Sequence, residues 1–117
     1  MPRELTRKLR AELRELHSLA WERELAQGLT NLEQQFRLWK EGKLDAFELS
    51  DKIHSFHNDE SRKLYSLYSH RYSPGAVPSA IARGIVDQAE GSDDLFAKIA
   101  GEIQLFREAQ EETSGVT

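Results

Sequence analysis

The sequence contains no cysteine, so disulfide bonds, thiolate catalysis and zinc sites with cysteine ligands are excluded. Its first residues, MPRELTRKLRAELREL, are charged throughout and lack the apolar segment of a secretory signal. No apolar run approaches the roughly 20 residues that a membrane-spanning helix needs. We therefore expect a cytoplasmic protein with no membrane partner.

Sequence motifs of the common enzyme classes are also lacking. There is no phosphate-binding glycine loop, nucleophile elbow or dinucleotide-binding fingerprint, and no strand pattern or internal repeat. Of the 117 residues, 38% are hydrophobic and 31% are charged, which suits a thin helical bundle with much exposed surface. We expect one domain over residues 1–112, a frayed C-terminal tail over 113–117, no cofactor and a function that is not enzymatic.

Apolar residues recur every three to five residues through the first third of the chain, which is the period of one buried helical stripe. The stripe consists of Leu5, Leu9, Leu13, Leu16, Ala20, Leu25, Leu29, Leu32, Phe36 and Trp39. A helix over about residues 3–40 is roughly 55 Å long, whereas a compact domain of this size is roughly 35 Å across. The helix must therefore bend or extend into another chain.

Glycine marks two positions in this long helical pattern. Gly28 lies inside it and costs about 1 kcal/mol relative to alanine, so we expect a bend there. The alternative is a break, with Thr30 or Asn31 as the cap of a second segment. Gly42 is a suitable C-terminal stop for the first helix.

A second helix is predicted over residues 45–57. Asp45 is a strong N-cap residue, and Glu48 follows at the spacing of a capping box. The apolar pattern then continues to about residue 71, through a segment rich in capping residues. The sequence leaves open whether residues 45–71 form one helix or two.

Two further helices are predicted after a turn at Ser73–Gly75. Ser79 is the expected cap of a helix that ends at Gly91, and Ser92 is the expected cap of the last helix. The chain as a whole predicts an all-α fold, a four- or five-helix bundle with a long N-terminal helix.

Residues 48–60 carry the side chains best suited to chemistry. Asp51 and His54, and likewise His57 and Glu60, have the three-residue spacing of metal-ligand pairs in helical bundles. A metal-binding or hydrolase-type site at these four residues is therefore the alternative to an interaction protein. If these residues have a purely structural role instead, His57 is buried or at the boundary of the core, bonds a carboxylate and fixes the junction at Asn58.

The run DKIHSFHNDESRKLYSLY, residues 51–68, resembles a stretch of small bacterial proteins of uncharacterised function. Those proteins are themselves predicted to be all-helical and cytosolic. The resemblance implies the same fold class and compartment and supplies no activity. It directs attention to His54, His57 and Arg62.

Basic and aromatic residues alternate from Arg62 to Tyr72, a pattern that can hold single-stranded nucleic acid. The formal net charge of the protein is −4, and tyrosines at this spacing more often pack between helices with their hydroxyls at the rim. We therefore do not expect a nucleic-acid partner.

The expected partner is a second copy of the chain, because two-fold pairing is the commonest closed symmetry. Another protein is the alternative partner. In this interpretation the first helix extends into the partner, and its interface residues are Leu5, Leu9, Leu13, Leu16 and Trp21. The predicted function is that of a homodimeric interaction or regulatory module.

Overall fold

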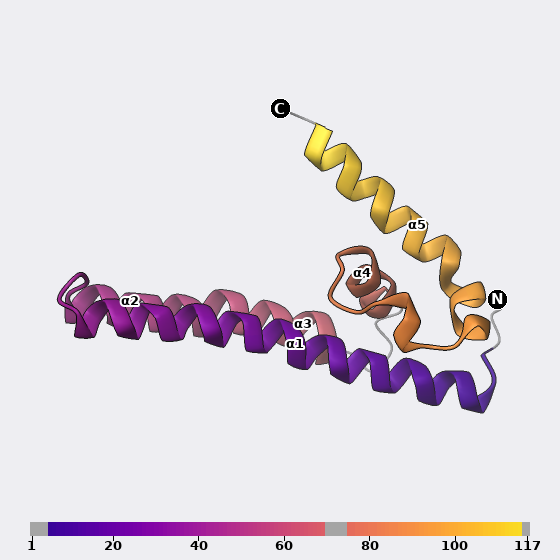
Figure 1. The fold of residues 1–117 in the computed structure, drawn as a ribbon, viewed down its shortest axis with the longest axis horizontal. Helices are drawn as coiled ribbons and strands as arrows, with labels where there is room; N and C mark the ends of the chain where they lie inside the picture. Colours follow the sequence, from indigo (N-terminus) through magenta and orange to yellow (C-terminus); the bar gives the residue numbers. More distant parts are fainter. Residues whose placement is uncertain (1–4, 70–74, 116–117) are drawn as a thin grey trace. The chain divides into compact units, whose positions relative to one another are not determined.

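The computed structural model describes residues 5–69 and 75–115, and every regular element in these ranges is helical (Figure 1). In chain order the elements are α1 (Arg7–Lys40), α2 (Ala46–Ser55), the π-helix η1 (Phe56–Ser61), α3 (Arg62–Ser69), α4 (Ala76–Ala82), the 3-10 helix η2 (Gln88–Glu90) and α5 (Asp93–Gly115). The predicted all-α class and the long N-terminal helix are confirmed.

The chain divides into two compact units, and α1 contributes to both. One unit contains the described residues up to Ala20 together with residues 75–115. The other contains residues 21–69 and is called the hairpin below. The prediction of one domain and of a frayed tail stays a prediction; α5 extends to Gly115.

Helix α1 is uninterrupted over its 34 residues, roughly 51 Å at about 1.5 Å per residue. A break after Gly28 is therefore the wrong alternative. The Thr30 hydroxyl donates to the Ala26 carbonyl oxygen at 2.9 Å, the bond of a mid-helix threonine and not of a cap. The bend expected at Gly28 stays a prediction.

The end of α1 is set by Gly42, as its sequence position predicts. Gly42 has a φ of +79°, a left-handed conformation that glycine adopts without strain. Its N–H donates to the Trp39 carbonyl, and the N–H of Lys43 donates to the Leu38 carbonyl. These two bonds form a Schellman motif that satisfies the last carbonyls of the helix.

The segment after the turn is one continuous helical path from Ala46 to Ser69 with a π-helical turn inside it. Its start is the predicted capping box: the Asp45 carboxylate accepts from the Glu48 N–H at 2.7 Å, and the Glu48 carboxylate accepts from the Asp45 N–H at 3.0 Å. The wide turn η1 contains Asn58, the junction at which the sequence leaves open whether residues 45–71 form one helix or two.

Helix α4 differs from the prediction of a helix over residues 79–91. It begins at Ala76 and ends at Ala82, because Gly84 has a φ of +81° and closes a second Schellman motif. The N–H of Ile85 donates to the Ala80 carbonyl across that motif. The sequence also predicts a turn at Ser73–Gly75, but residues 73 and 74 lie outside the described residues.

The last helix begins as predicted. The Ser92 hydroxyl oxygen accepts from the Leu95 N–H at 3.2 Å, so Ser92 is the N-cap of α5. The acidic residues Asp93 and Asp94 occupy the first turn, where the helix dipole favours negative charge.

The N-terminal half of α1 packs inside its own unit. The Glu12 carboxylate accepts from the Ser92 backbone N–H at 2.9 Å, and a Cβ added to Gly91 would lie 3.2 Å from the Leu16 side chain. The buried core of this unit consists of Leu9, Leu16, Ala20, Ala76, Val77, Pro78, Ala80, Ile81, Val86, Leu95, Phe96, Ile99 and Ile103. The apolar residues Leu9, Leu16 and Ala20 of this part of α1 are therefore covered by the chain itself.

His17 lies half-buried on the same part of α1. Burial lowers its pKa below the ordinary value of 6.5, because the charged imidazolium loses hydration. The folded unit therefore favours the neutral imidazole.

We expect the free energy of unfolding to decrease as the pH falls below 6.5, the ordinary His17 pKa, because the unfolded chain then binds the proton more readily than the folded chain. Urea denaturation between about pH 7 and pH 5 measures this slope. The variant His17→Gln should lose less stability over the same interval. Equal pH dependence in the two proteins would contradict the lowered pKa.

Gly28→Ala should destabilise the protein by about 1 kcal/mol, because overpacking outweighs the gain in helix propensity. A Cβ at this position would lie 2.8 Å from Cε1 of Phe56. The matched control is Gly101→Ala in α5, where an added Cβ meets nothing within 4 Å, so a gain of up to about 1 kcal/mol is expected. Both are measured by urea denaturation.

The sign of the Gly28→Ala effect depends on the Phe56 ring. In a Phe56→Ala background the same substitution should become stabilising. Destabilisation of similar size in both backgrounds would show that contact with Phe56 is not the reason for the glycine.

Candidate interaction surface

The hairpin pairs residues 21–40 of α1 with the returning path of α2, η1 and α3, which runs antiparallel to it (Figure 1). Near its middle, the Phe56 ring lies against the backbone at Gly28. Near its open end, the Trp21 ring stacks on Tyr68 at a centroid distance of 6.0 Å and meets the edge of Tyr65 at 6.0 Å. These contacts define which side of each helix faces the other.

Tyr68 is the anchor of the open end of the hairpin. It is 1% exposed, and its hydroxyl donates to the Glu24 carboxylate at 2.5 Å. The buried hydroxyl is thereby satisfied, and the ring is covered by Trp21. This tyrosine packs between helices, as expected for the stretch from Arg62, whereas Tyr72 lies outside the described residues.

The four candidate metal ligands lie at the surface. Asp51, His54, His57 and Glu60 are all exposed. Within residues 5–69 and 75–115, no group of three or more His, Asp or Glu side chains is placed to hold a metal ion. The structure therefore gives no support to a metal-dependent site here.

The interpretation of His57 as a buried or boundary residue is wrong, because its side chain is exposed. Phe56, the first residue of η1, has its ring against α1 at Gly28, whereas the adjacent imidazole is exposed. A helical wheel with a constant 3.6-residue turn does not describe a segment that contains a π-helical turn.

The five predicted interface residues are only partly open to a partner. Leu9 and Leu16 are 6% and 4% exposed. Leu5, Leu13 and Trp21 are half-buried, and Trp21 is engaged by two tyrosine rings. An interface at these residues stays a prediction, but two of them are already buried by the chain itself.

Exposed large hydrophobic side chains gather instead in the hairpin. Among the described residues there are seven, and all but Leu105 belong to residues 21–69. The six in the hairpin are Leu29, Phe36, Trp39, Phe47, Ile53 and Tyr65. This concentration marks the hairpin as the unit with uncovered apolar surface.

The two sides of α1 in the hairpin differ in chemistry. With Gly28 facing the returning path, Leu29 and Phe36 both turn about 80–100° to one side, at about 100° per residue. They are 49% and 37% exposed. The opposite side carries three exposed amides, Gln27, Asn31 and Gln34. Leu29 and Phe36 therefore lie on one side of this helix, and the three exposed amides lie on the other.

The returning path contributes to the same apolar side. Ile53 precedes Phe56 by three residues, and Tyr65 precedes Tyr68 by three, so each turns about 60° from a residue that contacts α1. In an antiparallel pair of right-handed helices, equal turns from the contact line bring residues to the same side. Leu29, Phe36, Ile53 and Tyr65 are therefore called the apolar flank.

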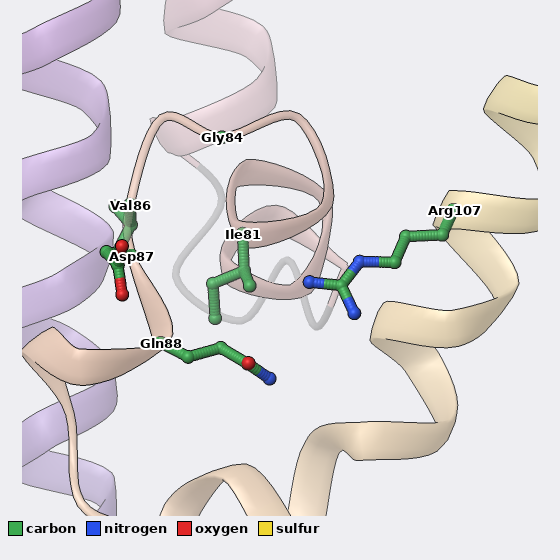
Figure 2. A pocket seen from close by; sticks show the side chains of 6 residues that line it. All are labelled: Ile81, Gly84, Val86, Asp87, Gln88 and Arg107. Atoms are coloured by element: carbon green, nitrogen blue, oxygen red, sulfur yellow. The ribbon is translucent and has the colours of Figure 1, made fainter.

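The other unit contains an open hollow of about 190 Å³ between α4, the following loop and α5 (Figure 2). It is lined by Ile81, Gly84, Val86, Asp87, Gln88 and Arg107. Arg107 reaches toward Ile81 across the opening, and Asp87 caps η2 by accepting from the Ala89 N–H at 2.8 Å. The lining residues include no pairing of a nucleophile with a base, so we assign no catalysis to this hollow.

No family model, curated protein or solved structure matches the chain. Within the described residues, no helix is both long and apolar enough to cross a membrane. The apolar flank is therefore argued from its own residues. The resemblance of residues 51–68 to small bacterial proteins stays a hypothesis.

The sequence pattern did not identify the apolar flank. Leu29 and Phe36 belong to the stripe of residues that the sequence predicts to be buried. Gly28 alone indicates which side of α1 faces the returning path. The sequence does indicate the opposite side of α1, because Gln27, Asn31 and Gln34 repeat at helical spacing.

Tyr68→Phe should lower the free energy of unfolding by roughly 1–3 kcal/mol, because the bond to the Glu24 carboxylate is lost. The matched control is Tyr65→Phe, whose ring is 62% exposed and whose change should stay within about 0.5 kcal/mol. Urea denaturation followed by tryptophan fluorescence, to which Trp21 and Trp39 both contribute, measures both. Equal losses in the two variants would contradict the anchoring role of Tyr68.

Proposed function

We propose that this protein is a non-enzymatic helical interaction module that self-associates through its long N-terminal helix. The observation that carries the proposal is the apolar flank of the hairpin, with Leu29 and Phe36 on α1 and Ile53 beside them. We assign the proposed contact to the C-terminal half of α1, because Leu9 and Leu16 in its N-terminal half are buried.

Two physical arguments support association at the apolar flank. Burial of apolar surface contributes roughly 25 cal/mol per Å² before the entropic costs of association. Aromatic side chains are enriched at interfaces, and the apolar flank carries two, Phe36 and Tyr65. The amides on the opposite side of α1 gain nothing comparable from burial.

A second copy of the chain is the simplest partner, because self-association requires no other protein. A two-fold interface uses the same surface on both copies, and each copy carries the complete apolar flank. The hairpin also carries charges of both signs beside its exposed apolar residues, among them Glu33, Arg37, Lys40 and Glu41, so two copies do not meet as surfaces of one charge.

Sedimentation velocity at several concentrations tests the proposal. The natural protein should sediment as a dimer, and Leu29→Gln/Phe36→Gln should raise the dissociation constant at least about tenfold, the equivalent of about 1.4 kcal/mol. Both positions are exposed, so circular dichroism should show an intact helical fold. The matched control is Gln27→Ala/Gln34→Ala on the opposite side of α1, which should dimerise like the natural protein.

Two results would contradict the proposal. One is a natural protein that stays monomeric at every concentration. The other is a Leu29→Gln/Phe36→Gln variant that dimerises as tightly as the natural protein, because the flank would then take no part in the contact.

A further inference from the structure

The spacing of the two large side chains on α1 suits a two-fold contact. Leu29 and Phe36 are seven residues apart, two turns of helix, and lie on the same side of α1. The midpoint between them falls between Leu32 and Glu33. A two-fold axis through this midpoint places Leu29 of each copy against Phe36 of the other, so the larger and smaller side chains alternate.

The charges on this side of α1 favour the antiparallel direction. Glu22 and Lys40 both turn about 120° from Gly28 to the side of the apolar flank, one toward each end of it. Both side chains are exposed, and neither forms an ion pair with another described residue. They are therefore available to a partner.

From this arrangement we infer that the second copy lies antiparallel on the apolar flank, with Leu29 against Phe36 and with Glu22 of each copy near Lys40 of the other. The inference rests on the proposed self-association and adds the occupant and its direction. About the two-fold axis, Lys40 of the second copy lies at the level of Leu25, three residues or roughly 4.5 Å from Glu22. A lysine side chain spans that offset.

The parallel alternative brings like charges together. Glu22 would face Glu22, and Lys40 would face Lys40, and such juxtaposition opposes association. In the antiparallel arrangement Glu33 is the charged residue of this side that lies near its own counterpart, at the axis. Its carboxylate is already 3.4 Å from Arg37 one turn along the same helix, which offsets the repulsion.

Thiol cross-linking distinguishes the two directions, because the natural chain has no cysteine and each introduced thiol is unique. With a short bifunctional maleimide, Glu33→Cys should link to itself efficiently. Glu22→Cys should not, since its two copies lie roughly 31 Å apart in the antiparallel dimer. An equal mixture of Glu22→Cys and Lys40→Cys should give the mixed dimer.

A charge exchange provides the second readout. Glu22→Lys should weaken dimerisation several-fold in sedimentation, and Glu22→Lys/Lys40→Glu should restore it to within about twofold of the natural protein. A variant that merely perturbs the helix would not be rescued in this way.

The outcomes separate the inference from the proposed function. A dimer in which Glu22→Cys links to itself as well as Glu33→Cys does would be parallel and would overturn the inference while leaving self-association intact. A dimer in which Glu33→Cys does not link would place the contact elsewhere and would also overturn it. A chain that is monomeric in every variant would remove both.

Discussion

The close approach of Phe56 to Gly28 is the constraint on which the hairpin depends. Phe56 is the first residue of the π-helical turn, and a residue without a side chain at position 28 lets its ring reach the backbone of α1. This contact fixes the side of α1 that faces the returning path. It thereby leaves Leu29, the next residue, on the apolar flank, where this residue is 49% exposed.

Helix α1 contributes to both units, and the apolar residues of its two parts are buried to different extents. The N-terminal part is covered within its own unit, where Leu9, Leu16 and Ala20 are buried. In the C-terminal part, three of the five residues of the apolar stripe stay exposed, namely Leu29, Phe36 and Trp39.

The elements that the sequence predicted are those set by local bonds. Asp45, Gly42 and Ser92 each act on backbone groups within four residues, so their patterns in the chain suffice to identify them. The early end of α4 shows the limit of this approach, because apolar spacing continues past Gly84 although the helix does not.

The apolar flank could not be predicted in this way, because it depends on contacts between positions that are distant in the sequence. Gly28 meets Phe56 across 28 residues, and Glu24 meets Tyr68 across 44. No periodic pattern encodes such pairings, so the sequence placed Leu29 in the core and His57 near it. The π-helical turn makes prediction harder still, because it changes the helical period inside residues 48–60, the segment with the candidate metal ligands.

Methyl NMR during dilution tests the central claim most directly, since it reports separately on the apolar flank and on the buried core. The account predicts that the methyl resonances of Leu29 and Ile53 shift with protein concentration, while those of Ile103, which is 1% exposed, stay constant. Constant shifts at Leu29 and Ile53 throughout the dilution would contradict it.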